Sequence, residues 1–322
     1  MPRTTLGNRL ERARRGVAPG GGGRAPRDLH RKAKSFGGRR ATLIAFAVPS
    51  LILLVLLSVY PVIFAGMQSV RNGTLISDGE FVGLQNFFTV LTATGFWEAA
   101  RFTLVFTVVA VFGSWTVGLA FALALRTRIP GRSVFKVLLL LPWIVPVVVS
   151  STSWNWLVAT PQSPFPIVAD ALGLGNVLFL ANPLLAQITV CVFKVWISFP
   201  FMMMMMSSAM ASVDINVYEA ARVDGASARQ IFFGITLPLI ARPTYISWIL
   251  MTIFSVNDFP TIFLLTGGGP VSATTTLVVL SYRTVFAQYQ TGPGTAIAAL
   301  MTMTLVIVSV VLYRQIRKVN IE

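Results

Sequence analysis

Two charged residues in otherwise apolar stretches are the first candidates for chemistry. Lys194 and Asp258 each lie deep inside a long apolar run. A charge at the centre of a lipid bilayer costs about 2.5–3.5 kcal/mol on insertion scales, so such a residue usually faces a cavity or an opposite charge. An ammonium and a carboxylate can bind a polar solute that crosses the membrane, or they can neutralise each other. The sequence leaves both roles open for this pair.

The residue types that most enzymes use are scarce in this chain. Its single histidine is His30, in a basic segment, and its single cysteine is Cys191, in an apolar run. These counts exclude a histidine-based metal site, a Ser-His catalytic pair and an internal disulfide. The glycine run 20–23 is not followed by Lys-Ser/Thr, so it is no phosphate-binding loop of the Walker A type. We therefore expect no enzyme activity, no catalytic residue, no metal and no cofactor in this chain.

The composition indicates which elements position the two charges. The chain is 55% hydrophobic and only 11% charged, whereas a soluble domain carries about 25% charged residues. Its longest apolar runs can each cross about 30 Å of hydrocarbon as a helix that rises 1.5 Å per residue. The sequence therefore predicts an all-α membrane protein with six transmembrane helices. The predicted spans are 42–66, 102–125, 134–159, 184–211, 237–265 and 295–313.

Basic residues alternate from one side of these spans to the other. Most of the 26 Lys and Arg residues fall in four places: before the first span, between the second and third, between the fourth and fifth, and after the sixth. The positive-inside rule predicts that both termini lie in the cytoplasm. We divide the chain into a disordered basic cytoplasmic tail, 1–40, a membrane domain, 41–316, and a cytoplasmic C-terminal end, 317–322. The tail can contact anionic lipid.

The segment 214–236 is the most charged part between two apolar runs. Asp214 is suited to cap the start of a helix, and Gly225 tolerates the left-handed conformation that often ends one. Ser227 and Gln230 form a capping box that starts a second helix. Alanines around the turn leave room for another backbone to approach. The segment therefore predicts a compact helix–turn–helix that docks against another protein.

This segment resembles the EAA loop of binding-protein-dependent ABC importer permeases. The resemblance rests on Glu-Ala-Ala at 219–221, Asp-Gly at 224–225 and Leu-Pro at 237–238. In that family the loop is the cytoplasmic coupling helix, which sits in a cleft of the ATPase subunit. The resemblance implies a type I ABC importer permease fold, with the coupling loop at 214–236. The ATPase-coupling residues that it implies are Glu219, Ala220, Ala221, Asp224 and Gly225.

Gly-Leu-x-Asn-Phe at 83–87, after a Tyr-Pro pair, also resembles a segment of this family. Two further segments resemble the permeases that import maltose and related sugars: Leu-Thr-Gly-Gly-Gly-Pro at 265–270 and Trp-x-x-x-Pro-aromatic at 196–201. Counting from Glu219 without gaps carries the family's sugar-contacting positions onto this chain. Lys194 and Asp258 depart from the maltose pattern, which leaves the solute open. The implied pathway residues are Lys194, Ile197, Ser198, Phe201, Ser255, Asn257 and Asp258.

The resemblance implies a permease subunit of an ATP-driven importer in a bacterial inner (cytoplasmic) membrane, for a di- or oligosaccharide delivered by an external binding protein. The implied partners are a second homologous permease, two ATPase subunits that bind ATP and Mg, the extracytoplasmic binding protein and membrane lipid, without nucleic acid. Two alternatives stay open. Lys194 suits an anion such as a glycerol phosphate ester, and Lys194 with Asp258 could form the relay of an ion-coupled secondary transporter.

Overall fold

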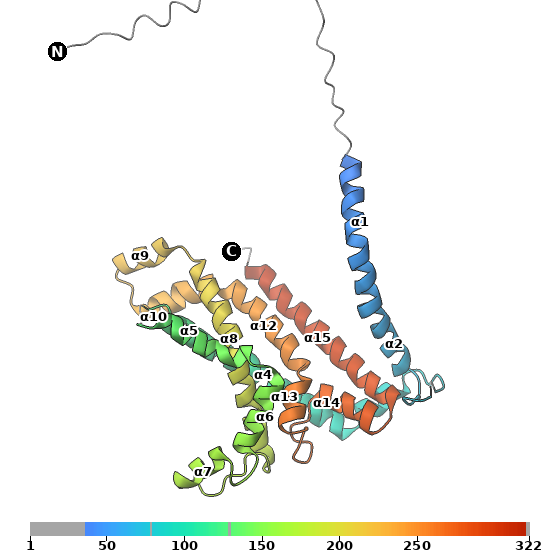
Figure 1. Cartoon of the computed structure of the whole chain (residues 1–322). Coiled ribbons are helices and arrows are strands. Elements are labelled where there is room, and N and C mark those ends of the chain that lie inside the picture. Colours follow the sequence, from blue (N-terminus) through green and yellow to red (C-terminus); the bar gives the residue numbers. More distant parts are fainter. Residues whose placement is uncertain (1–35, 78, 128–129, 320–322) are drawn as a thin grey trace, which may run out of the picture. The chain divides into compact units, whose positions relative to one another are not determined.

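The computed structural model describes residues 36–77, 79–127 and 130–319. Contacts divide the chain into two units, Met1–Ser58 and Val59–Glu322. The described residues are helical apart from turns and one isolated bridge between Arg71 and Phe81 (Figure 1). The helices are α1 (Phe36–Leu54), η1 (Val55–Val59), α2 (Tyr60–Ser69), α3 (Gln85–Thr92), α4 (Thr94–Ala124), α5 (Arg132–Ile144), α6 (Val147–Val158), α7 (Pro164–Ala171), α8 (Pro183–Ala211), α9 (Ile215–Val223), α10 (Ala228–Ile231), η2 (Phe232–Thr236), α11 (Leu237–Leu239), α12 (Ala241–Val256), α13 (Phe259–Leu265), α14 (Leu277–Tyr282), η3 (Arg283–Ala287) and α15 (Thr291–Val319).

Part of the predicted domain division lies outside the described residues. Of the predicted tail, only 36–40 are described, and they already belong to α1. Of the predicted C-terminal end, only 317–319 are described, and they continue α15. The two boundaries therefore stay predictions, with helix extending past each of them.

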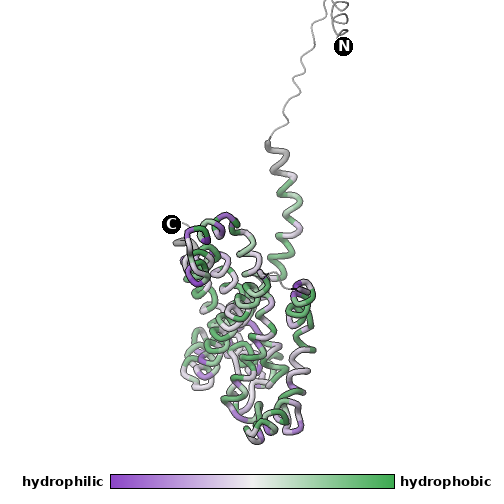
Figure 2. The backbone as a smooth tube through the Cα atoms, turned by 90° about the vertical axis from the view of Figure 1, so that its left-hand side faces the viewer, coloured by the Kyte–Doolittle hydropathy of each residue, from purple (hydrophilic) through white to green (hydrophobic). Residues whose placement is uncertain are grey.

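Four helical stretches of the described chain are long and apolar enough to cross a membrane. Two further pairs of helices, each bent at a short break, raise the number to six if each pair is one span. The hydrophobic colour that follows most of the helical tube in Figure 2 agrees with this membrane fold. Four predicted spans are confirmed. They are matched by Thr42–Ser69, Thr94–Ala124, Pro183–Ala211 and Thr291–Gln315.

The predicted third span, 134–159, corresponds to a bent pair of helices and not to one continuous helix. α5 ends at Ile144, α6 begins at Val147, and the two helices meet at 92°. Pro146 has no N–H to continue the helix, and its ring pushes the preceding residue towards extended backbone. Val145 has φ −68° and ψ 131°, as this restriction requires.

The predicted fifth span, 237–265, is also wrong as a continuous helix. The helical pair that takes its place is Ala228–Leu239 with Ala241–Val256, bent by 64°. It ends at Val256, and α13 is a separate short helix. Pro260 has no N–H for the carbonyl of Val256, and its ring would clash with that carbonyl in a regular helix, which favours the end of α12 at Val256. Asn257 and Asp258 consequently lie in a non-helical break.

α8 is the central helix of the second unit. It lies along α4 and also contacts α5, α12 and α13. A Cβ atom at Gly118 of α4 would lie 2.6 Å from the backbone nitrogen of Met203 and 2.7 Å from the Cβ of Met202, so a glycine is needed there. In the most apolar window of each helix, 61% of α8 but only 17% of α15 is buried. α15 thus presents its apolar side outwards, as a helix in contact with lipid does.

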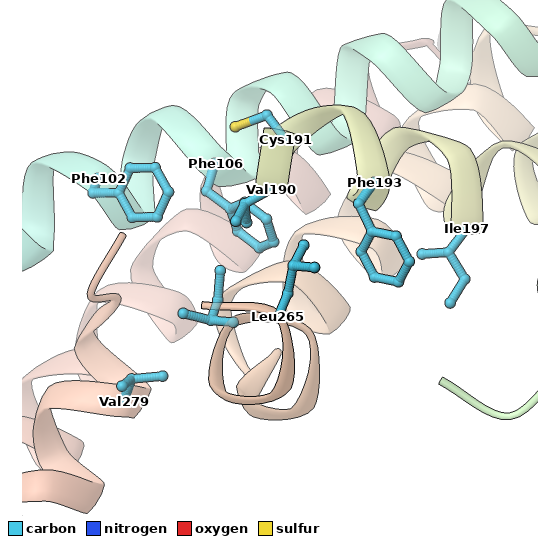
Figure 3. Packing of buried hydrophobic residues seen from close by; sticks show 9 residues of the cluster. Phe102, Phe106, Val190, Cys191, Phe193, Ile197, Leu265 and Val279 are labelled. Atoms are coloured by element: carbon cyan, nitrogen blue, oxygen red, sulfur yellow. The ribbon is translucent and has the colours of Figure 1, made fainter. Parts of the chain in front are cut away.

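Buried apolar side chains hold α8 against α4, α13 and α14 (Figure 3). α8 contributes two aliphatic residues, an aromatic residue and Cys191, which is buried and unpaired as a small core side chain. The packing fixes the turn of α8 that carries Lys194 beside α13. The cluster consists of Phe102, Phe106, Val190, Cys191, Phe193, Ile197, Ile262, Leu265 and Val279.

Candidate functional site

Lys194 and Asp258 form a buried ion pair. Lys194 Nζ lies 2.6 Å from Asp258 Oδ2, and each side chain is 8% exposed. Among the residues whose side chains the structure describes, 42–77, 79–127 and 130–315, this is the one ion pair. Of the two roles that the sequence leaves open, mutual neutralisation is therefore present. A contact of either residue with a solute stays a prediction.

The break between α12 and α13 determines how the carboxylate is held. Asp258 occupies the position before α13, and its Oδ1 accepts a hydrogen bond from the N–H of Thr261 at 3.1 Å. One oxygen is thus used by the helix start and the other by Lys194. Burying a charge is tolerated when it is paired and its remaining hydrogen-bonding sites are satisfied. This geometry meets both conditions for Asp258.

The three other polar pathway residues differ in their surroundings. Ser198 lies one turn after Lys194 on α8, and Ser255 lies at the end of α12; both are 1% exposed. The Ser255 hydroxyl has no hydrogen-bond partner. Asn257 is exposed and its Nδ2 donates to the carbonyl of Ile253 at 2.9 Å. The structure therefore brings the two serines into the interior, and it leaves Asn257 at the surface of this chain.

The two apolar pathway residues also separate. Ile197 belongs to the core cluster around α8 and is 9% exposed. Phe201 is half-buried and stacks on Trp143 of α5, with ring centroids 5.3 Å apart and an interplanar angle of 25°. Phe254 of α12 meets the same ring edge-on at 6.0 Å. Trp143 and Phe254 extend the aromatic wall, and the resemblance did not identify either of them.

Four buried hydroxyls without a partner lie on elements that pack around the ion pair. α6 contacts α13, and both α12 and α13 contact α8. An unpaired buried polar group costs about 1–3 kcal/mol, so such groups mark places for water or for the hydroxyls of a solute. Only Ser255 was predicted, because single serines on an apolar helix give no sequence signal. The four are Ser150, Ser151, Ser255 and Thr261.

The second candidate site is the turn between α9 and α10. The side chain of Asp214 accepts a hydrogen bond from the N–H of Asn216 at 3.0 Å and so caps α9. Ser227 and Gln230 form the predicted capping box, in which the Ser227 N–H donates to Gln230 Oε1 at 2.8 Å. The predicted helix–turn–helix geometry is confirmed.

Gly225 forms the turn itself. Its φ of +77° lies in the left-handed region that favours glycine. The N–H of Ala226 donates to the carbonyl of Ala221 at 2.9 Å and closes the end of α9. Ala221 is only 9% exposed, so its side chain supports α9 from within. The exposed members of the predicted coupling set are Glu219, Ala220, Asp224 and Gly225.

The exposed face of α9 carries both charge and apolar surface. Val223 is 88% exposed and Val217 is 40% exposed. Within the described residues, Glu219 and Asp224 have no basic partner inside 4 Å. Unpaired carboxylates beside exposed valines are typical of a surface that another protein covers. The resemblance did not include the two valines, although exposed apolar residues on a charged helix are a signal that could have found them.

A cation–π contact anchors this helix to the rest of the chain. The guanidinium carbon of Arg126, in the turn after α4, lies 4.0 Å from the ring centroid of Tyr218 in α9. Tyr218 is 4% exposed. α9 also follows directly on α8, in which Lys194 and Ala211 are about 25 Å apart along the helix axis. The two candidate sites are therefore distant but connected through one central helix.

Comparison with known proteins gives concordant results. The model of the family described as binding-protein-dependent transport system inner membrane component matches residues 114–319. The trehalose/maltose transport system permease protein MalF of Thermococcus litoralis is 34% identical over 246 residues, which cover 76% of this chain and 83% of that protein. The trehalose transport system permease protein SugA of Mycobacterium tuberculosis H37Rv is 30% identical over 269 residues, covering 81% and 84%.

The fold has a counterpart among solved structures. A crystal structure of a bacterial ABC transporter involved in the import of the acidic polysaccharide alginate contains a chain that superimposes with a TM-score of 0.77. The two chains share 20% identity, and the match covers 87% of this chain and 96% of the other. This likeness establishes the ABC importer permease fold.

Proposed function

Because this chain belongs to the family of binding-protein-dependent transport system inner membrane components, we propose that it is a permease subunit of an ATP-driven carbohydrate importer. A di- or oligosaccharide is delivered by an external binding protein. The single observation that carries the coupling to ATP is the exposed, doubly capped turn at Gly225, which projects beyond the end of the central helix α8 (Figure 1). Relatives named for trehalose and maltose support the solute class.

The ion pair favours an uncharged solute. Asp258 neutralises Lys194, so the pair offers no free cation to an anion such as a glycerol phosphate ester. The spare donors of the ammonium and the buried serine hydroxyls suit sugar hydroxyls instead. The stacked rings of Trp143 and Phe201 suit the apolar face of a sugar. We assign solute binding to Lys194, Ser198, Phe201, Ser255, Asn257 and Asp258, and support of the wall to Ile197.

In the transport cycle that we propose, the ATPase acts on this chain through α9. Two partner ATPase subunits bind ATP and Mg and supply the energy by closing and opening. The face that carries Glu219, Ala220, Asp224 and Gly225 docks on one of them, and Ala221 supports that face from beneath. Motion of α9 reaches the ion pair through α8, and a second homologous permease completes the pathway. The distribution of Lys and Arg supports a cytoplasmic position for both termini and for this turn, by the positive-inside rule, in a bacterial cell.

Reconstituted vesicles test this function. This chain, its partner permease, the ATPases and the binding protein are incorporated together, and uptake of radiolabelled maltose, trehalose and glycerophosphodiesters is measured. We expect disaccharide uptake that requires ATP and the binding protein and is unaffected by a proton ionophore. Uptake of the phosphodiesters alone would contradict the carbohydrate assignment. Uptake without ATP that collapses with the proton gradient would instead support the ion-coupled transporter.

A further inference from the structure

A cavity of about 650 Å³ lies on the side of the molecule where α4 ends, α5 begins and α8 leads into α9. Three basic residues line it, Arg126, Arg132 and Lys136, together with the hydroxyls of Ser207 and Ser208. The remaining lining consists of apolar side chains, chiefly methionine and alanine. We call it the basic cavity.

Within the part of the chain that the structure describes, no acidic side chain pairs with the cations of the basic cavity. The lining found among these residues holds no acidic residue. Among the described side chains, the one ion pair is that of Lys194 with Asp258, and neither residue lines this cavity. Three cations around one hollow repel each other, and an anion placed among them would relieve that repulsion. The charge of the cavity therefore selects an anionic occupant.

The apolar surface beside the cavity indicates which kind of anion. Arg132 and Lys136 lie in the first turns of α5, and the helix continues with Val137, Leu138 and Leu141, which are 58%, 53% and 44% exposed. A basic rim that passes directly into an exposed apolar helix face matches a molecule with a charged head and a hydrocarbon tail. Basic pockets between helices on the cytoplasmic side of a membrane bind such headgroups.

We propose that the basic cavity binds the phosphate-bearing headgroup of an anionic phospholipid from the cytoplasmic leaflet, with its acyl chains along α5. This inference rests on the orientation given under the proposed function. Arg132 and Lys136 hold the phosphate, and Ser207 and Ser208 donate hydrogen bonds to its oxygens. Arg126 borders the cavity and also contacts Tyr218 of α9, so a bound headgroup lies against the residue that anchors the coupling turn.

Lipid binding to the purified complex tests the proposal. The full chain with its partner subunits is titrated with phosphatidylglycerol and, separately, with phosphatidylcholine, and bound lipid is counted by native mass spectrometry. The variant Arg132→Gln/Lys136→Gln leaves the Arg126–Tyr218 contact in place. It should weaken phosphatidylglycerol binding by about 30-fold, since each basic side chain near an anionic surface contributes about a factor of five. Arg314→Gln, which removes an exposed charge from α15, is the matched control and should leave binding unchanged.

Two further arms separate the possible occupants. Inorganic phosphate at millimolar concentration should not displace phosphatidylglycerol from the wild-type complex. If phosphate binds without lipid and with the same dependence on Arg132 and Lys136, the cavity holds a free anion and the lipid proposal is overturned. The proposal is also overturned if the double variant and the wild type bind phosphatidylglycerol equally well. It is overturned likewise if the double variant loses a partner subunit but still binds the lipid, because the two side chains then hold that subunit and not the lipid. None of these measurements requires sugar uptake, so a failure of the lipid proposal can be distinguished from a failure of the proposed transport function.

Discussion

At the scale of single residues, Asp258 does two things at once. Its Oδ2 pairs with Lys194, and its Oδ1 caps the start of α13 through Thr261. A substitution can separate these functions, because asparagine keeps an oxygen at the capping position but carries no charge. The same residue therefore links the polar interior of the membrane domain to the helix break that places it there.

We expect Asp258→Asn to destabilise the protein by about 3–5 kcal/mol, because it leaves the ammonium of Lys194 buried without a counter-ion. Asp258→Ala should cost about 1 kcal/mol more, through loss of the helix cap. The double variant Lys194→Met/Asp258→Leu should be milder than Asp258→Ala, since no uncompensated charge remains. Chemical unfolding of the detergent-solubilised protein measures all three. A double variant that is at least as unstable as Asp258→Ala would contradict the ion pair.

Uptake assays on the same variants address the solute-binding role. If Lys194 and Asp258 contact the solute, the double variant should fold yet transport disaccharide poorly, with a raised KM. Normal uptake and normal KM in the folded double variant would limit the pair to a structural role. Trp143→Ala provides a second probe, since it removes the stacking partner of Phe201 without touching a charge.

At the scale of elements, the contact of α4 with α8 depends on the absence of a side chain at Gly118. A methyl group there would meet the backbone of Met203 rather than the end of a flexible side chain. Asn86 provides another such fixed point: its Nδ2 donates to the carbonyls of Ser69 and Arg71, at 2.9 and 2.8 Å, and joins α3 to the end of α2. The first contact sets α4 against α8, and the second ties together α2 and α3, which both pack on α15.

Gly118→Ala should lower stability by about 1–3 kcal/mol, because the added methyl overpacks the interface between α4 and α8. Gly95→Ala is the matched control on the same helix, since a Cβ there meets nothing within 4 Å. Thermal unfolding in detergent compares the two variants. Equal midpoints for both would show that α4 and α8 are not in close contact.

The coupling turn supplies a second prediction at this scale. Gly225→Asp or Glu219→Lys should reduce ATP-dependent uptake at least about tenfold, the effect of losing ~1.4 kcal/mol at the interface with the ATPase, while membrane insertion is retained. Gly175→Asp is the control, because Gly175 has a similar φ of +73° and the same open surroundings in a different loop. Full uptake by both turn variants would reject the coupling role of the turn.

At the scale of the whole molecule, two of the six spans that the sequence predicts are each a bent pair of helices. Each bend has a local position, at Pro146 in one pair and around Ile240 in the other. Each bend changes the direction of the whole helix that follows it. A further break, set by Pro260, brings non-helical backbone to the position of Asp258. Irregular backbone is tolerated inside a membrane domain where protein surrounds it or where it lines a polar cavity.

Cysteine labelling tests the orientation of the chain. Cys191 is buried and should not react with the label, so any labelling comes from the cysteine that is introduced. Val271→Cys, at a position that is 95% exposed, should react with a membrane-impermeant maleimide in intact cells. Ala220→Cys in α9 should react only after the cells are permeabilised. Labelling of Ala220→Cys from outside would place the turn on the wrong side for an ATPase.

The sequence alone determined the features that depend on neighbours along the chain. Four spans, the caps at Asp214 and Ser227 and the turn at Gly225 could be predicted, because apolar run length, capping and glycine conformation are local properties. Pro146 was visible in the sequence, but the direction and size of the bend at that residue were not. Family membership likewise followed from residues close together in one segment.

Only the tertiary structure decided which distant residues meet. The pairing of Lys194 with Asp258, the stacking of Trp143 on Phe201 and the contact of Arg126 with Tyr218 each join different helices. The basic cavity likewise gathers side chains from four helices, α4, α5, α8 and α9, around one hollow. A periodic apolar pattern shows that a helix is buried but not which neighbour buries it, because many packings of the same apolar faces satisfy the same pattern.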